Sequence, residues 1–349
     1  MATSEQPDSS IRRARIRLRR RRWMRTAGIC VLAASAALAV APASALAGPA
    51  GSPGVIPREF TATQMYAKFG WLPAGSYLVS GGTTQLAQYL TSGGPRGGRW
   101  NLTVEARGAC HVTRTGYALL CSPYNVKNPL TVRGPDVNGH RAFWLQNRAE
   151  LAWEYGTKAW AFLSYSNPRP LHGALAETGL RVAKAVEFGQ HVPIEFASRL
   201  TSGARHWEVL STSFQREQGV YLAGGYLIAK ATLSQAAKNE ASVGTGLVNM
   251  PEITTIPQTS AEYCNIPKSW PKRHVTIHGY KLTLALLTKH RLHNGYSLPG
   301  RVLCGRNEDG LFVNIIEYGA HEPLTPTGVM YRTELLGVRK ADWVKNPLR

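Results

Sequence analysis

The fold of this chain depends on residues 141–166, RAFWLQNRAELAWEYGTKAWAFLSYS, which hold three of its nine tryptophans. Gly156-Thr157 suits a two-residue hairpin loop, because a type II′ turn has glycine at its first central position. Gln146-Asn147 gives a second loop of the same length. The two loops agree in register and predict a three-stranded antiparallel meander.

This register pairs Trp153 with Trp160 and places the aromatic residues on one face. The residues expected on that face are Ala142, Trp144, Ala149, Leu151, Trp153, Tyr155, Trp160 and Phe162. An exposed aromatic face would promote aggregation, so it needs a cover. Residues 171–188 have apolar positions near helical spacing, preceded by Pro170 and followed by Gly189, and predict a covering helix. Residues 61–70 also suggest a short helix.

These elements predict an α+β fold in which antiparallel meander sheets are each covered by a helix. The second half repeats two short words: "VNGHRAF" at Val137 resembles "IHGYKLT" at Ile277, and "AWEYG" at Ala152 resembles "IIEYG" at Ile315. Two related units would explain this repetition, and chance similarity of short words is the alternative. The expected organisation is a signal peptide at 1–47, a flexible tether at 48–57, and sheet-and-helix units at 58–190 and 191–349. The second unit includes an extended surface linker at 251–259.

Residues 1–47 have the pattern of a secretory signal peptide. Nine arginines precede an apolar run at 26–40, which is shorter than the roughly 20 residues that span a bilayer. Ala45-Leu46-Ala47 forms an A-x-A cleavage site. Residues 20–25, RRRWMR, resemble the twin-arginine export pattern, so both that route and general secretion remain open. We expect a secreted protein, cleaved after Ala47, with no transmembrane segment in the mature chain.

Four cysteines remain after the leader: Cys110, Cys121, Cys264 and Cys304. An even number in an exported chain indicates disulfides. Three pairings are open, and we favour Cys110–Cys121 with Cys264–Cys304 because each pair lies within one half. No spacing is C-x2-C, so we expect no metal site.

The mature chain is strongly basic. Removing the leader, with nine arginines and two acidic residues, leaves 32 basic and 19 acidic residues, a formal net charge of +13. Such a charge favours anionic partners. Because the basic residues are scattered, and residues 270–274 are the only local instance of basic residues interleaved with aromatic ones, we expect no specific nucleic-acid binding. An anionic wall polymer or an apolar small ligand is the expected partner.

Catalytic motifs are absent from the sequence: it contains no G-x-S-x-G, H-E-x-x-H, Walker loop or G-x-G-x-x-G. We therefore assign no catalytic residue and expect no cofactor. The main interpretation of the aromatic face is the core of a folded domain. The alternative is a groove between sheet and helix, for which the candidate ligand-binding residues are Trp144, Trp153, Trp160 and Phe162. The leading hypothesis is a non-enzymatic binding or structural protein of the cell envelope or extracellular space. A secreted hydrolase of wall or extracellular polymer, with no sequence-local motif, is the second hypothesis.

The chain also resembles uncharacterised exported proteins of high-GC Gram-positive bacteria. The resemblance rests on "WLPAG" at Trp71, the meander, and the tail "LLGVRKADWVKNPLR" at 335–349. It implies no established activity. The meander-plus-helix pattern is similar to envelope proteins of the lipoprotein-carrier and sigma-factor-regulator type, whose curved sheet covers a helix and can hold an acyl chain. That likeness concerns the fold alone.

Overall fold

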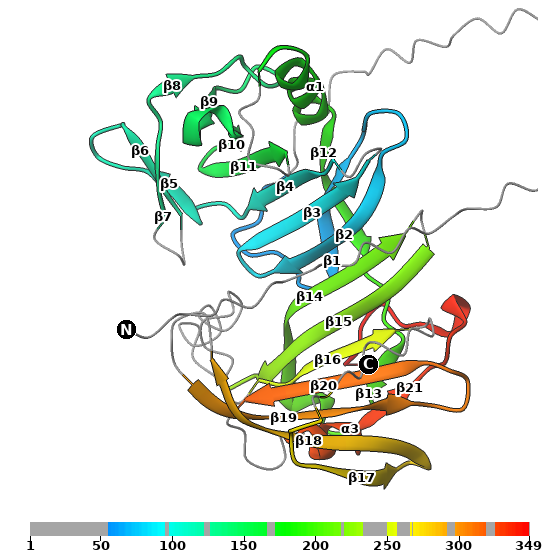
Figure 1. Ribbon diagram of the computed structural model, residues 1–349. Helices are drawn as coiled ribbons and strands as arrows, with labels where there is room; N and C mark the ends of the chain where they lie inside the picture. Colours follow the sequence, from blue (N-terminus) through cyan, green and yellow to red (C-terminus); the bar gives the residue numbers. More distant parts are fainter. Residues whose placement is uncertain are drawn as a thin grey trace, which may run out of the picture. The chain divides into compact units, whose positions relative to one another are not determined.

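The structure is a computed structural model that describes residues 55–94, 98–121, 126–165, 172–217, 220–232, 250–256, 266, 268–291, 297–318 and 325–348. All of these residues belong to one compact unit. Most of them lie in antiparallel strands, and two α-helices are described, α1 (Gly173–Lys184) and α3 (Pro326–Met330) (Figure 1). The predicted signal peptide and residues 48–54 of the tether lie outside the described residues. The fold is therefore mostly β, and the α+β prediction is wrong.

The largest sheet has fourteen strands, and each strand is antiparallel to its neighbours. In spatial order they are β17 (Lys272–Ile277), β18 (Tyr280–Arg291), β19 (Ser297–Arg306), β20 (Phe312–Tyr318), β16 (Glu252–Ile256), β15 (Val220–Lys230), β14 (Trp207–Glu217), β2 (Tyr77–Thr84), β3 (Ala87–Gly93), β4 (Trp100–Glu105), β11 (Ala159–Tyr165), β10 (Glu150–Gly156), β9 (Ala142–Leu145) and β8 (Val132–Arg133).

Three small sheets accompany the large one. They are the pair β1 (Gln64–Phe69) with β12 (Val186–Pro193), the pair β13 (Ser198–Leu200) with β21 (Thr333–Leu335), and the three strands β5 (Cys110–Val112), β6 (Ala118–Cys121) and β7 (Val126–Pro129). Short 3-10 turns lie at Gln146–Arg148, Ala204–His206 and Lys340–Asp342.

The predicted meander is present as β9, β10 and β11, but its register differs. Trp153 lies opposite Ala161 instead of Trp160. The predicted two-residue loop between β9 and β10 is replaced by the 3-10 turn Gln146–Arg148. A β-bulge also follows Glu154 in β10. The turn places four residues between the paired Leu145 and Glu150 where two were expected, and the bulge leaves Tyr155 without a cross-strand partner.

The shifted register divides the four aromatic candidates between two faces, since a slip of one residue turns every side chain of a strand over. Trp144 and Trp153 pack in the main core. Trp160 and Phe162 pack on the opposite face in a second cluster, with Cys110 and other residues of the β5–β7 region. Both faces are covered, because Trp153 and Trp160 are each only 1% exposed. The single aromatic face of the prediction is therefore wrong.

The main-core face is covered by a strand pair as well as by a helix. Residues 64–69, which fall in the predicted short helix, form β1. The predicted helix at 171–188 ends early, because the chain enters β12 at Val186. Phe188 of β12 stacks on Tyr155 of the meander, with ring centroids 4.2 Å apart. The cover is thus partly β, which explains why the helix-on-sheet prediction fails.

The sheet continues across the predicted unit boundary. Residues 190 and 191 lie inside β12, and β14 pairs with β2, so that Phe214 faces Gly81. The described part of the predicted linker at 251–259 is not a surface linker. Its residues form β16 between β15 and β20, with Ile253 and Ile256 buried. Residues 257–259 lie outside the described residues.

The Cys110–Cys121 disulfide is confirmed, and the two cysteines face each other in β5 and β6. Cys304 is also disulfide-bonded, whereas Cys264 lies outside the described residues. In the ranges that the structure describes, no helix has the length and apolar character needed to cross a membrane.

Candidate functional site

An apolar cavity of about 310 Å³ lies between the β1–β12 pair and the large sheet. Ten of its thirteen lining residues are uncharged and apolar, and the other three are Lys68, Glu195 and Arg216. The apolar residues are Met65, Ala67, Phe69, Leu72, Leu78, Leu90, Val192, Pro193, Ile194 and Phe214. Figure 1 shows β1 and β12 beside β2 and β3, from which most of these residues come. This cavity is the candidate ligand site.

One wall of the cavity is formed by a row of side chains across three neighbouring strands. Leu90, Gly81 and Phe214 lie opposite one another in β3, β2 and β14. A Cβ atom at Gly81 would lie 2.8 Å from both Leu90 Cδ2 and Phe214 Cζ. Glycine at this position therefore lets the two apolar side chains close over β2. Glycine inside a strand is a general sign of such close approach.

The next row on the same face is polar and holds the chain segment that forms the opposite wall. Gln88, Thr83 and Thr212 lie opposite one another, and all three are buried. Thr212 Oγ1 donates a hydrogen bond of 2.6 Å to the carbonyl of Ala62, and Thr83 Oγ1 donates one of 3.0 Å to the carbonyl of Gln64. These bonds fix β1 at a set height above the sheet, with the cavity beside it.

Gln88 has a specific role, because it satisfies the backbone at a bulge in β1. The β1–β12 register shifts between Met65 and Ala67, so Tyr66 has no cross-strand partner. Gln88 Oε1 accepts hydrogen bonds from the Tyr66 amide (2.6 Å) and the Ala67 amide (3.1 Å). Its Nε2 donates to the Ala67 carbonyl (2.8 Å). A buried side chain thus supplies the partners that a regular ladder would have provided.

The charged lining residues differ in their pairing. Lys68 pairs with Glu187 at 3.0 Å, and Glu195 pairs with Lys340 at 2.7 Å. Arg216 makes no ion pair with any described residue. The cavity lining therefore carries one guanidinium whose charge no described carboxylate neutralises.

The aromatic residues proposed from the sequence lie elsewhere. Trp144, Trp153, Trp160 and Phe162 are core residues, and none of them lines this cavity. Their role in ligand binding stays a prediction. The site itself was missed because residues 61–70 were expected to be helical. The Gly81-Gly82 pair was the available signal, since glycines in a strand mark a close approach.

Two further cavities are open and basic. One, of about 610 Å³, is lined by Arg58, Arg107 and Lys158 together with uncharged residues. The other, of about 550 Å³, is lined by Lys272, Arg273, Arg301 and uncharged residues. None of the described residues in either lining carries a carboxylate.

The structure shows no converging catalytic groups in these three cavities. Burial raises the pKa of Glu105 to about 8, and burial also raises the pKa values of Glu150 and Glu252. None of the three carboxyls lines one of the cavities. Among the described residues, no three His, Cys, Asp or Glu side chains come together as a metal site.

Comparison with known proteins does not place the chain in a family. No protein-family model matches it, and no curated protein matches it. Among solved structures, the crystal structure of MucB in complex with MucA(peri) is 7% identical, covering 75% of this chain and 93% of that chain. Its TM-score is 0.18, which is too low to show a shared fold.

Proposed function

We propose that this chain is an exported binding protein for a small anionic amphiphile. The apolar tail of the ligand would lie in the cavity between β1–β12 and the large sheet, and its acidic head would lie beside Arg216. The observation that carries this proposal is an apolar cavity whose lining includes a guanidinium without a described carboxylate partner.

Cavity chemistry supports this class of ligand. Transfer of a hydrocarbon chain from water is favourable by about 25 cal/mol per Å² of buried apolar surface. A volume of about 310 Å³ lies near the lower end of the range for small-molecule sites, roughly 300–1,000 Å³, which suits one chain rather than several. Val192, which is 45% exposed, shows that the cavity lining reaches the surface.

The head group is argued from the arginine. A guanidinium donates paired, charge-assisted hydrogen bonds to a carboxylate or a phosphate. The Arg216 guanidinium carbon lies 5.1 Å from the ring centroid of Phe214, and this contact orients the side chain over the cavity wall. A neutral lipid would leave that charge unused, so we propose an acidic head.

Export is the remaining part of the proposal. The Cys110–Cys121 disulfide is typical of proteins that leave the cytoplasm. Together with the leader pattern of residues 1–47, it supports a ligand that is met outside the cytoplasm, in the envelope or the medium.

The test is a titration of the purified mature protein with a long-chain fatty acid and with the alcohol of equal chain length. We expect the acid to bind more tightly. Replacement of Leu72 by Trp should fill the cavity and abolish binding of both ligands. Arg216→Gln should weaken binding of the acid about tenfold, the effect of about 1.4 kcal/mol, with little change for the alcohol.

Val338→Trp is the matched control, because it adds the same side chain at an exposed position that lines none of the three cavities. Thermal unfolding of each variant shows whether it folds. Wild-type affinity in a folded Leu72→Trp variant would exclude the cavity as the ligand site. Equal loss of acid and alcohol in Arg216→Gln would exclude an acidic head at that position.

A further inference from the structure

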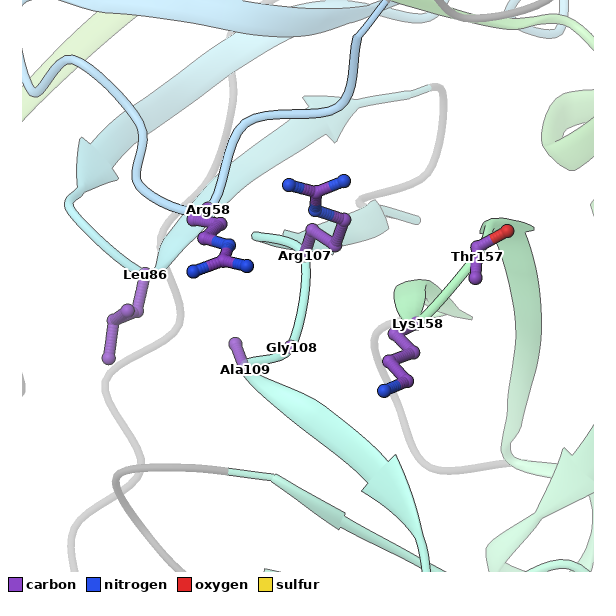
Figure 2. A pocket seen from close by; sticks show the side chains of 7 residues that line it. All are labelled: Arg58, Leu86, Arg107, Gly108, Ala109, Thr157 and Lys158. Atoms are coloured by element: carbon purple, nitrogen blue, oxygen red, sulfur yellow. The ribbon is translucent and has the colours of Figure 1, made fainter.

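The larger basic cavity brings together three cations from distant parts of the chain. Arg58 precedes β1, Arg107 follows β4, and Lys158 lies in the turn between β10 and β11. Figure 2 shows Gly108 and Ala109 between Arg58 and Lys158. The other lining residues, Leu86, Gly108, Ala109 and Thr157, carry no charge. Like charges around one cavity create a strong local potential for anions.

Backbone hydrogen bonds tie the loops of this cavity to one another. The Arg107 amide donates to the Pro57 carbonyl (2.9 Å), and the Gly108 amide donates to the Lys158 carbonyl (2.7 Å). The segments that carry the three cations are therefore connected directly. The Cys110–Cys121 disulfide follows the Arg107 loop after two residues. Fixed loops reduce the conformational entropy that a ligand would have to remove.

Nearby carboxylates do not cancel this charge. Glu154 accepts a hydrogen bond from the Lys158 amide through Oε1 (2.9 Å), but its Oε2 pairs with Arg141 at 2.8 Å. Glu59, next to Arg58, does not line the cavity. Burial raises the pKa of Glu105 to about 8, so this carboxyl is mainly neutral at pH 7. The positive charge of the cavity is thus left uncompensated by the described residues around it.

Lys158 is an unusual residue for its position. Its φ is +57°, in the left-handed region, where a residue with a side chain costs roughly 1–2 kcal/mol and glycine or asparagine is favoured. Local strain of this kind is often kept where the side chain has a function. Here the strained residue lines the cavity.

We propose that Arg58, Arg107 and Lys158 form a site for the phosphodiester groups of an anionic polyol or sugar polymer. The cavity is open and all three cations are exposed, as suits a chain lying across the surface. Its volume of about 610 Å³ exceeds the space that one phosphate needs. Arginine binds phosphate oxygens in pairs. Among the described residues, no aromatic side chain lines the cavity to stack a nucleobase, which argues against single-stranded nucleic acid.

The experiment measures the affinity of the mature protein for poly(glycerol phosphate) by calorimetry. The triple variant Arg58→Gln, Arg107→Gln, Lys158→Gln should bind at least about tenfold more weakly, since it loses several charge-assisted contacts. The matched control is Lys272→Gln, Arg273→Gln, Arg301→Gln, which removes the same two arginines and one lysine from the other basic cavity. We expect that control to change affinity less than about threefold. Both triple variants lose the same net charge, and salt screens the long-range effect of that loss.

A second variant separates function from stability. Lys158→Gly relieves the left-handed strain, so its Tm should equal or exceed that of the wild type while its affinity for the polymer falls. Equal losses in the two triple variants would overturn the proposal in favour of a general basic surface. A single-stranded oligonucleotide of equal charge that binds as tightly as the polymer would also overturn it. The described residues that line this cavity are all different from those that line the apolar one, so fatty-acid binding remains a separate measurement.

Discussion

At the scale of single residues, Gln88 links the two sheets that enclose the apolar cavity. Its side chain makes three hydrogen bonds to the backbone of β1 and is fully buried. Tyr66 is skipped in the β1–β12 pairing, so its amide has the Gln88 side chain as its acceptor in place of a partner in β12. Buried amides and carbonyls that lose their partners each cost about 1–3 kcal/mol.

We expect Gln88→Met to lower the free energy of unfolding by about 2–4 kcal/mol, because methionine keeps the shape and removes the hydrogen bonds. Urea unfolding measures this change. Gln215→Met, on the exposed side of β14, is the control and should change stability by less than about 0.5 kcal/mol. A loss below about 1 kcal/mol in Gln88→Met would show that β1 is held by packing alone.

Single residues also show what the sequence could predict. The similar words at Val137 and Ile277 form turns of the same kind: φ is +51° at Asn138 and +81° at Gly139, and +52° at His278 and +82° at Gly279. Both residues of a type I′ turn need positive φ, and Asn-Gly is its usual sequence. The local likeness is therefore physical, whereas a duplication of whole units stays a prediction.

At the scale of elements, the existence of the meander strands was predictable but their register was not. The aromatic stretch and the turn at Gly156 locate β10 and β11. The register depends on loop length, and Gln146 and Arg148 adopt positive φ without being glycine. Glutamine and arginine rarely adopt positive φ, so these residue types do not predict such a turn. β1 was missed because a short apolar stretch fits a helix or a strand equally. Its strand conformation depends on contacts with distant residues, such as the hydrogen bonds from the Gln88 side chain in the other sheet.

The small β5–β7 sheet gives a test at this scale. Its disulfide closes a loop of 11 residues, which corresponds to a stabilisation of roughly 3 kcal/mol on the loop-entropy estimate. We expect the double variant Cys110→Ala, Cys121→Ala to lose about 2–3 kcal/mol and to show faster amide hydrogen exchange in β11, where Trp160 and Phe162 pack in the same cluster. Unchanged exchange in β11 would contradict a covering role for this sheet.

At the scale of the whole molecule, one continuous sheet of fourteen strands contains strands from both units expected from the sequence. Sequence patterns locate strands but do not show that β14 will pair with β2, 127 positions apart at Thr84 and Ser211. Such long-range pairing is decided by which faces need cover, and here the face with Gly81 is covered by β1 and β12. Hydrophobic patterns are local to each half of the chain, so they cannot predict the β14–β2 pairing that joins the halves.

Stability of the whole protein should decrease as the pH rises through neutrality. The pKa of Glu105 is about 8 in the folded protein against an ordinary value of 4.5. Between these values the folded state binds more protons than the unfolded state, so stability is full below about 4.5 and is lost as pH rises to about 8. Each pH unit in this window lowers the free energy of unfolding by up to about 1.4 kcal/mol from this group.

Glu105→Gln should therefore flatten the curve of unfolding free energy against pH and stabilise the protein at pH 8. Urea unfolding at pH 5, 6.5 and 8 measures both effects. Burial also raises the pKa values of Glu150 and Glu252, so a reduced slope should persist in the variant. A variant curve that is parallel to that of the wild type would assign the slope to those two groups.

The two edge strands of the large sheet, β17 and β8, differ in charge and in length. An edge strand exposes unpaired amides and carbonyls, to which another molecule can add a strand. β17 begins with Lys272, Arg273 and His274, all exposed, and β8 has only two residues, one of them an arginine paired with Asp136. The charged side chains of β17 and the short length of β8 oppose this extension of the sheet. The two edges of the large sheet thus protect the protein against fibre formation.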